Sequence, residues 1–341
     1  MKKTLLFIFS LLTLSLLAQD IKFDVLSNAG GRISNVNSAS FTFGQPFVGS
    51  ITNGTNSIRQ GFQQPSFMMG VPGCMDTLAL NYDSLATIND SSCTYQMTYV
   101  PDDNFEQALI NLGYDNILDD SVITANINTV TSLIVSGQNI SDLTGIEDFT
   151  ALSYLDCNYN QLTSLDVSQN IALIDFNCQN NQLTNLDVSQ NTALTFLNCV
   201  INQLTSLDVS NNTALIDLYF HTNQLTTINV SQNIALLVLD CSSNQLTTLD
   251  VSNNTAISQL YCNTNQLTSL DVRNGNNINM NQYNSTNNPN LNCIDVDDPV
   301  YSTANWTNID PWSSFSSNCA TAFGCTDSLA SNYNPLATID D

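Results

Sequence analysis

The sequence predicts a mostly β solenoid, because one motif recurs at a fixed interval and alternates apolar with polar residues. The run NQLTSLDVSQN begins at Asn160, and close relatives of it follow every 21 residues. They begin at Asn181, Asn202, Asn223, Asn244 and Asn265. Repetition at such a period usually builds a stack in which each unit contacts only its neighbours. We therefore expect a right-handed stack over residues 131–290, with one coil per 21 residues.

Each repeat contains two similar halves, and both are typical of short strands. One half runs from Leu152 to Asn160 as L-x-x-L-x-C-x-x-N, and the other from Leu162 to Asn170 as L-x-x-L-x-V-x-x-N. Apolar residues two positions apart suit a strand that buries one face. The Asn that ends each half tolerates a tight turn and can bond the turn backbone with its amide. Stacked coils would place these Asn side chains in columns, each bonding its neighbours.

The residues before the repeats predict an exported protein. Residues 1–19 have the form of a secretory signal, with Lys2 and Lys3 before the apolar run Leu5 to Leu17. That run is shorter than the roughly 20 residues a membrane span needs. We therefore expect a secreted or cell-surface protein with no transmembrane segment after the signal is removed. Residues 20–70 alternate apolar and polar residues around Gly and Asn turns, which predicts a small β module.

An Asp- and Asn-rich motif occurs twice. Residues 71–97 contain GCMDTLALNYDSLATINDSSC, and residues 323–341 contain GCTDSLASNYNPLATIDD. In the first copy Cys93 follows Cys74 by 19 residues, and we expect these two to form a disulfide. The same spacing from Cys325 falls beyond the last residue, which predicts that the second copy is truncated.

We expect both ends of the stack to be covered, because an open solenoid end exposes its core. Residues 98–130 include a predicted helix, with Asp103 and Glu106 at capping-box spacing and Gly113 as its stop. Its apolar stripe comprises Phe105, Ala108, Leu109 and Leu112. Residues 291–322 do not follow the repeat pattern and contain both Trp residues, as expected of a terminal cap.

The repeat L-x-x-L-x-C-x-x-N-Q-L closely resembles the leucine-rich repeat, L-x-x-L-x-L-x-x-N-x-L. Its nested form of ten plus eleven residues is similar to the short 21-residue bacterial class. The flanking modules resemble those of secreted Bacteroidetes-type surface proteins, which often leave the cell by type IX secretion through a C-terminal sorting domain. The resemblance implies a leucine-rich repeat fold and an exported protein, and the missing sorting domain fits a truncated chain.

Five cysteines share one position of the repeat, and three interpretations compete. A metal column would need thiolate ligands, but Phe220 holds that position in the fourth unit. Disulfides between coils are disfavoured because stacked side chains point in parallel. We favour Cys as a small buried apolar residue beside Leu. These cysteines are Cys157, Cys178, Cys199, Cys241 and Cys262. By contrast, Cys293 and Cys319 bracket the C-terminal cap, and we expect them to pair.

The outward positions of the two halves differ. In the half LTxLDVSxN they hardly change, and Thr recurs at one position from Thr163 to Thr268. In the other half they vary and include aromatic residues among carboxylates, which resembles a recognition surface. Because leucine-rich repeats commonly bind through their concave strand face, we place that face on the variable half. The predicted ligand-binding residues are Tyr154, Asp156, Asp175, Phe196, Asp217, Tyr219, His221, Asp240 and Tyr261. The alternative is unconstrained surface, and which half is concave stays open.

Calcium is the one cofactor that the sequence suggests. The first Asp- and Asn-rich motif gathers oxygen ligands, which Ca²⁺ prefers, but lacks the EF-hand spacing. These candidate ligands are Asp76, Asn81, Asp83, Asn89 and Asp90. An Asp column from Asp166 to Asp271 in the uniform half would set like charges about 4.8 Å apart, which bound cations would relieve. A solvated column without metal is the alternative.

Charge and composition narrow the function to binding or support. The chain has 30 acidic and 6 basic residues, so its surface repels nucleic acid. His221 is the only His, and no phosphate loop or nucleophile elbow is present, so we expect no enzyme. We predict an adhesin-like binding module for a protein or glycan. The alternatives are a structural spacer, the non-catalytic part of an enzyme that continues beyond residue 341, and an ordered surface for ice or mineral.

Overall fold

The computed structural model describes residues 70–322 and 328–331, together with four earlier strands. These strands form two antiparallel pairs, β1 (Ala29–Ile33) with β2 (Ala39–Phe43) and β3 (Ile51–Asn53) with β4 (Asn56–Ile58). The predicted signal and Cys325 lie outside the described residues. Contacts divide the chain into two compact units, one of Met1–Met75 and Asp83–Ser92 and one of Asp76–Tyr82 and Cys93–Asp341. The first unit also contains the short parallel pair β5 (Pro72–Gly73) and β6 (Ile88–Asn89).

A helical lid precedes the repeats in the second unit. It consists of β7 (Met97–Tyr99), α1 (Asp103–Leu112), β8 (Ser121–Ile123) and α2 (Thr124–Ile127). β7 and β8 pair antiparallel, and the apolar face of α1 joins the same buried core as the first coils.

Helix α1 forms as predicted, but its cap differs from the prediction. Asp102, not Asp103, is the N-cap, and its side chain accepts hydrogen bonds of 3.0 Å from the backbone N–H groups of Asn104 and Phe105. Glu106 takes no part in a capping box, because its buried carboxylate accepts hydrogen bonds from the backbone of residues 119–121. Leu112 is 46% exposed, so the buried stripe consists of the other three predicted residues. Gly113 ends the helix in the left-handed conformation (φ 83°).

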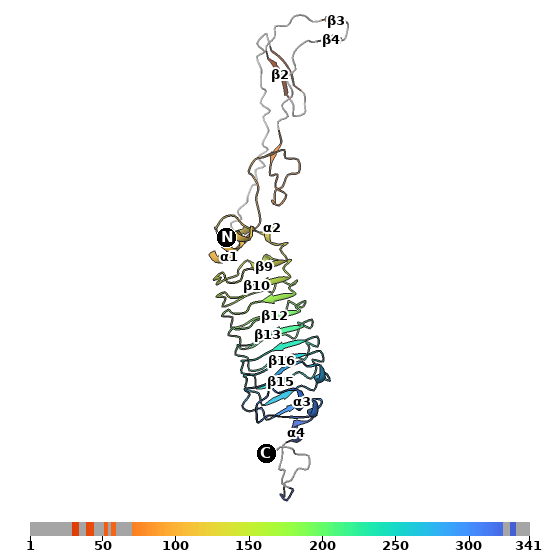
Figure 1. Cartoon of the computed structure of the whole chain (residues 1–341). Coiled ribbons are helices and arrows are strands. Elements are labelled where there is room, and N and C mark those ends of the chain that lie inside the picture. Colours follow the sequence, from red (N-terminus) through yellow and green to blue (C-terminus); the bar gives the residue numbers. More distant parts are fainter. Residues whose placement is uncertain are drawn as a thin grey trace, which may run out of the picture. The chain divides into compact units, whose positions relative to one another are not determined.

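The variable half of the repeat forms one parallel sheet of eight strands, one from each successive coil (Figure 1). In spatial order these are β9 (Ser132–Ile134), β10 (Tyr154–Asp156), β11 (Asp175–Asn177), β12 (Phe196–Asn198), β13 (Asp217–Tyr219), β14 (Val238–Asp240), β16 (Gln259–Tyr261) and β18 (Gln282–Asn284). The central residues pair in register, for example Leu155 with Phe176, and all point into the core. The predicted β solenoid is therefore confirmed.

The uniform half forms regular strands only towards its C-terminal end. β15 (Thr248–Asp250) and β17 (Ser269–Asp271) join β19 (Cys293–Asp295) and β20 (Ser314–Ser316) in a second, four-stranded parallel sheet. The remaining elements are η1 (Ile146–Asp148), η2 (Asn277–Asn279), α3 (Pro299–Asn305) and α4 (Cys319–Ala322).

Leucine, valine and cysteine columns fill the space between the two halves. Cys178 is fully buried, as predicted, whereas Leu165 is only partly buried against the core. The five repeat cysteines are free and buried, and Phe220 takes their place in the fourth coil with no exposed surface. Several of the thiols lie close to the carbonyl of the following coil, as Cys241 Sγ does at 3.3 Å from Tyr261 O. The interpretation of these cysteines as small core residues is confirmed.

Two columns of buried Asn fasten each coil to the next. In the column beside the eight-stranded sheet, Asn181 Oδ1 accepts from Leu162 N, and its Nδ2 donates to Cys157 O and Cys178 O. That column contains Asn160, Asn181, Asn202, Asn223, Asn244, Asn265 and Asn288. The other column contains Asn170, Asn191, Asn212, Asn233 and Asn254, which donate in the same way but whose Oδ1 atoms have no partner. The predicted Asn columns therefore exist in both halves.

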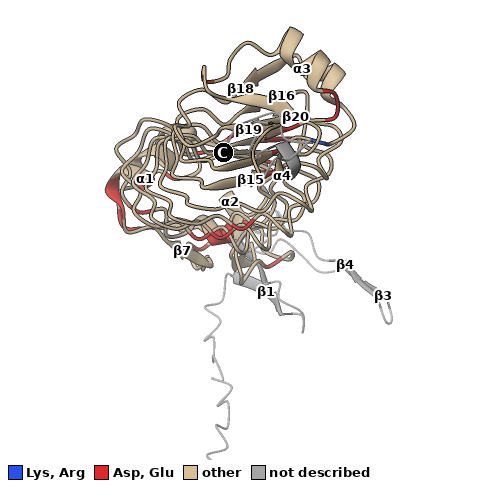
Figure 2. Cartoon of the chain, turned by 90° about the horizontal axis from the view of Figure 1, so that it is seen from below, with Lys and Arg blue, Asp and Glu red and all other residues tan. Residues whose placement is uncertain are grey.

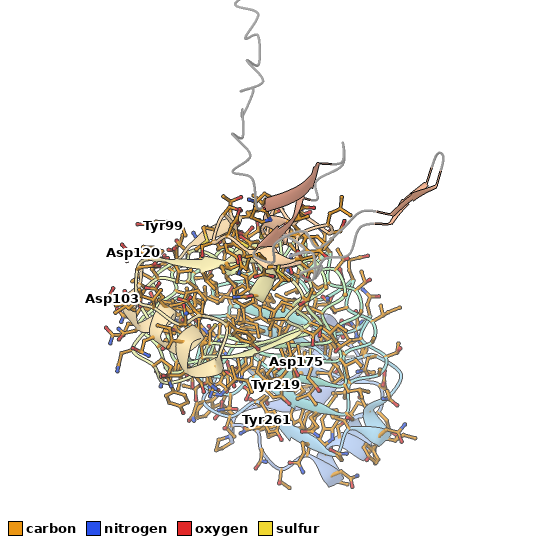
Figure 3. All side chains as sticks on the ribbon, turned by 90° about the horizontal axis from the view of Figure 1, so that it is seen from above. Tyr99, Asp103, Asp120, Asp175, Tyr219 and Tyr261 are labelled. Atoms are coloured by element: carbon orange, nitrogen blue, oxygen red, sulfur yellow. A yellow bond between two sulfur atoms is a disulfide. The ribbon has the colours of Figure 1, made fainter. Side chains whose placement is uncertain are left out.

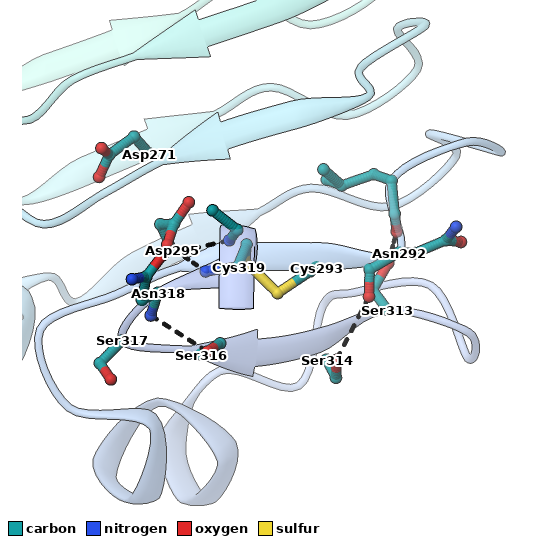
Figure 4. Close-up of a disulfide and its surroundings, with 12 residues drawn as sticks. Asp271, Asn292, Cys293, Asp295, Ser313, Ser314, Ser316, Ser317, Asn318 and Cys319 are labelled. Atoms are coloured by element: carbon teal, nitrogen blue, oxygen red, sulfur yellow. Dashed lines mark hydrogen bonds between the residues drawn. A yellow bond between two sulfur atoms is a disulfide. The ribbon is translucent and has the colours of Figure 1, made fainter. Parts of the chain in front are cut away.

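The C-terminal cap closes the stack with aromatic rings and a disulfide. Trp306 stacks on Tyr283, with ring centroids 4.3 Å apart, and both residues are buried. The predicted bond between Cys293 and Cys319 is present, and it fastens α4 to β19 (Figure 4). Beside it the backbone N–H of Cys319 donates to Asp295 Oδ1 at 2.8 Å. No described helix is long and apolar enough to cross a membrane.

Candidate functional site

The predicted binding residues lie on the outward face of the eight-stranded sheet. Each strand has three residues, and in most of them the middle one is buried and the two flanking ones are half-buried. Eight of the nine predicted residues occupy these flanking positions. In the view from above, the labels of Asp175, Tyr219 and Tyr261 lie close together (Figure 3). We call this surface the sheet face.

Strand register arranges aromatic and acidic side chains alternately in two columns. In the first column Tyr154, Asp175, Phe196 and Asp217 follow one another on successive strands. In the second column Tyr219, Asp240 and Tyr261 do the same. The columns meet diagonally at the Phe196 and Tyr219 rings, whose centroids are 5.7 Å apart at 45°. The structure therefore brings the predicted residues together as one continuous surface.

Partial burial shapes the electrostatics of the first column. Burial raises the pKa of the Asp175 carboxyl, and the nearby Asp156 raises it further. Burial likewise raises the pKa of Asp217. Neither carboxylate accepts a hydrogen bond from a described residue, so nothing local compensates for its lost hydration. An external hydrogen-bond donor or a cation would therefore stabilise the ionised form of these two carboxylates.

Acidic residues dominate the charge of the coils (Figure 2). Between residues 70 and 322 the only basic residue is Arg273. Its Nε donates to Asp271 Oδ1 at 2.9 Å, on the four-stranded sheet rather than the sheet face. No described cation therefore neutralises the sheet-face carboxylates.

His221 follows β13 and lies at the edge of the sheet face. Its side chain is half-buried, and its Nδ1 is 3.1 Å from Thr222 Oγ1. No carboxylate among the described residues bonds His221, and its role as a contact residue stays a prediction.

The acidic column of the uniform half has a different role. Asp166, Asp187 and Asp208 are exposed, and each accepts a hydrogen bond of 2.9 Å from the backbone N–H two residues later. This bond, supported by the side chain of the same Ser, lowers the pKa of each carboxyl. Asn229 makes the same bond in its own coil, so the position requires an oxygen and not a charge. The Asp side chains of this column therefore close turns, and cation binding along it stays untested.

The candidate calcium ligands also serve local turns. Within the first unit, the side chains of Asp83, Asn89 and Asp90 each accept from the backbone N–H two residues on. Within the second unit, Asp76 accepts from Leu78 N and Tyr95 Oη, and Asn81 accepts from Thr94 N. No group of three or more His, Cys, Asp or Glu among the described residues is arranged to hold a metal. Calcium binding by this motif stays a prediction.

The expected Cys74–Cys93 pairing also stays a prediction, although both cysteines are disulfide-bonded.

A shallow hollow of about 450 Å³ lies beside η1, on the uniform side of the first coils. Asp142, Glu147 and Asp166 contribute carboxylates to its lining. The Asp142 and Glu147 carboxylates accept from the backbone N–H groups of Thr144 and Gly145, so they too fix local turns. The sequence pattern did not predict this hollow, because part of its lining, Asp142 to Glu147, precedes the first regular repeat.

Known proteins resemble part of this chain in sequence. No model of a protein family matches the chain. Internalin J of Listeria monocytogenes is 39% identical over 72 residues, which are 21% of this chain and 8% of that protein. The solved functional domain of InlJ, which includes a cysteine ladder, is 34% identical with a TM-score of 0.47 and covers 59% of this chain and 52% of its own. Internalin C2 of the same species is 19% identical, with a TM-score of 0.49 over 65% of this chain and 99% of its own.

This chain thus spans about half of the InlJ structure and a small part of the whole internalin J. Both TM-scores are under 0.5, so the fold assignment rests on the repeat geometry described above. The chain has the repeat and the fold of a leucine-rich repeat protein, and over 72 residues it is similar to internalin J.

Proposed function

We propose that this is an exported leucine-rich repeat binding module, adhesin-like, which recognises a partner protein through the sheet face. The observation that carries the proposal is the continuous surface of half-buried aromatic and acidic side chains on the eight-stranded sheet. Tyr and Phe offer a large contact area and have few rotatable bonds, so ordering them on binding costs little entropy. The opposite half presents Thr, Ser and turn-closing Asp instead.

Rigidity supports the same proposal. The buried Asn columns fix every coil to its neighbours, so the sheet face keeps its spacing before a partner arrives. A preorganised surface loses less freedom on association, which strengthens binding. The signal-like residues 1–19 and the similarity to internalin J support a place outside the cell or on its surface.

Other functions remain as alternatives. A glycan could stack on the same tyrosines, and the repeats could act only as a spacer. A catalytic domain beyond residue 341 would make this region the non-catalytic part of an enzyme. The acidic charge disfavours nucleic acid as a partner.

Protein and glycan arrays probed with the full chain test the proposal. We expect protein signals that disappear when Tyr154 and Phe196 are both replaced by Ala, with unchanged thermal unfolding. Signals confined to glycans would assign the face to sugars. Protein signals that survive in the variant would place binding elsewhere, and no signal with either array would favour the spacer.

A further inference from the structure

One part of the sheet face places a carboxylate between two aromatic rings. Tyr219, Asp240 and Tyr261 occupy equivalent positions on β13, β14 and β16, which pair in register. All three side chains point outward and are half-buried. Neighbouring strands lie about 4.8 Å apart, so the two tyrosines are about 9–10 Å apart at their backbones with Asp240 midway.

We propose that these three residues form a clamp for a Lys or Arg side chain presented by a basic segment of the partner protein. The inference rests on the proposed function and names the chemistry that the face selects. A cation seated at Asp240 would lie within about 6 Å of both rings, which is the range of a cation–π contact. A planar guanidinium can bond a carboxylate while it stacks on aromatic faces.

Asp240 has an oxygen available for such a bond. Its Oδ1 accepts from the backbone N–H of Ser242 at 3.0 Å and from the Ser242 hydroxyl at 2.6 Å. Its Oδ2 accepts no hydrogen bond within the described part of the chain. The Ser242 contacts hold the side chain in one orientation, so little freedom is lost when a ligand binds.

Charge complementarity selects the occupant. Asp217 adds a second carboxylate next to the clamp; burial raises the pKa of Tyr219, and the nearby Asp217 raises it further. Arg273, the one basic residue of these coils, is already paired with Asp271 on the other sheet. A calcium ion is a poor alternative because it takes six to eight oxygen ligands. The clamp offers one carboxylate and two rings.

A neighbouring aromatic–acid pair extends the surface along the stack. Phe196 and Asp217 lie on adjacent strands, and the Phe196 ring contacts Tyr219. A partner segment with more than one basic residue could therefore engage successive coils.

Fluorescence anisotropy with the full chain tests the clamp. The probe is a labelled hexa-arginine peptide, and the matched neutral probe is hexa-citrulline, which has the same length and nearly the same shape. We expect hexa-arginine to bind and hexa-citrulline to bind at least tenfold more weakly, because only the first carries charge. Asp240→Asn should weaken hexa-arginine binding about tenfold, and so should Tyr219→Leu combined with Tyr261→Leu.

The control is Asp208→Asn on the uniform half, a position where Asn229 already stands in the next coil. Asp208→Asn should change hexa-arginine binding less than twofold, since it removes only a distant charge. Both Asp→Asn changes keep the local turn bond to Ser, so unfolding curves should match the unmodified protein.

The outcomes separate the two proposals. Equal weakening by Asp240→Asn and Asp208→Asn would reduce the effect to diffuse attraction and overturn the clamp. Suppose that array proteins no longer bind the Tyr154→Ala and Phe196→Ala variant, while Asp240→Asn leaves the affinity for hexa-arginine unchanged. That result would support the binding function and overturn the clamp. If neither the array nor the peptide responds to any sheet-face change, both proposals fall.

Discussion

The two halves of each coil each have a column of buried Asn, but two acids of one coil, Asp175 and Asp187, have opposite surroundings. Asp175 on the sheet face accepts no hydrogen bond from a described residue, and burial raises its pKa. Asp187, later in the same coil, is exposed and closes a turn with the backbone N–H of Ser189, which lowers its pKa. Asp240 on the sheet face closes a turn in the same way as Asp187. The comparison teaches that turn-closing carboxylates occur in both halves, whereas the sheet face also has carboxylates, Asp175 and Asp217, that no described residue bonds.

The largest expected effect comes from the Asn columns. Asn202→Ala removes four hydrogen bonds, with Leu183 N, Cys178 O, Cys199 O and Val200 O, and should lower the free energy of unfolding by about 3 kcal/mol. Asn212→Ala in the other half removes two, because its Oδ1 has no partner, and should cost about 1 kcal/mol less. Chemical denaturation of both variants measures the difference. An equal or reversed order would show that the unpartnered oxygen has a bond of its own.

A smaller effect is expected where each coil turns at the edge of the sheet. The residue before each Asn of the sheet-side column is left-handed, and Ile201 holds φ 52° there although it is β-branched. Ile201→Asn should stabilise the protein by about 1 kcal/mol, because a side chain with Cβ branching is strained in that region. Asn180 stands at the same position one coil earlier with φ 53°, so Asn180→Ile is the mirror experiment and should destabilise. If both changes were neutral in thermal unfolding, strain at this turn would be unimportant.

The smallest expected effect is the response of stability to pH. The raised folded pKa of Asp175 means that its ionisation opposes folding, so stability is regained as pH falls from neutral through that pKa towards 3.8. The lowered pKa of Asp187 has the opposite sign, and its contribution is lost only as pH falls below 3.8.

Urea unfolding between pH 7 and pH 3 measures both terms. Asp175→Asn should flatten the profile above about pH 4, and Asp187→Asn should flatten it below. Identical profiles for the two variants would contradict the difference between the halves.

Much of the fold could be predicted from the sequence, because the repeat period determines which residues contact one another. Spacing of 21 residues sets which residues stack, and apolar residues two apart set which face is buried, as Leu155 and Cys157 show. Turn details follow less well. Two adjacent acids, Asp102 and Asp103, are equally good caps until the backbone is known. No propensity places a β-branched residue such as Ile201 in a left-handed turn.

The candidate site likewise has features that the sequence predicts and features that it does not. Alternation predicts that Tyr219 and Tyr261 face outward, and the strands confirm it. The diagonal contact of Phe196 with Tyr219 depends on strand register and side-chain direction, which one repeat alone does not fix. The hollow beside η1 lies between the first regular repeat and the irregular segment Asp142 to Glu147, whose conformation no repeat pattern predicts.

One measurement tests the difference between the halves most directly, namely the affinity of paired variants for the strongest protein partner from the arrays. Tyr219→Ala with Tyr261→Ala should weaken binding by about 1–3 kcal/mol, within the range between an ordinary contact and a hot spot. Thr205→Ala with Thr247→Ala, both exposed on the uniform half, should leave the affinity unchanged. Loss of binding in the Thr pair with full binding in the Tyr pair would contradict the account and place the functional surface on the uniform half.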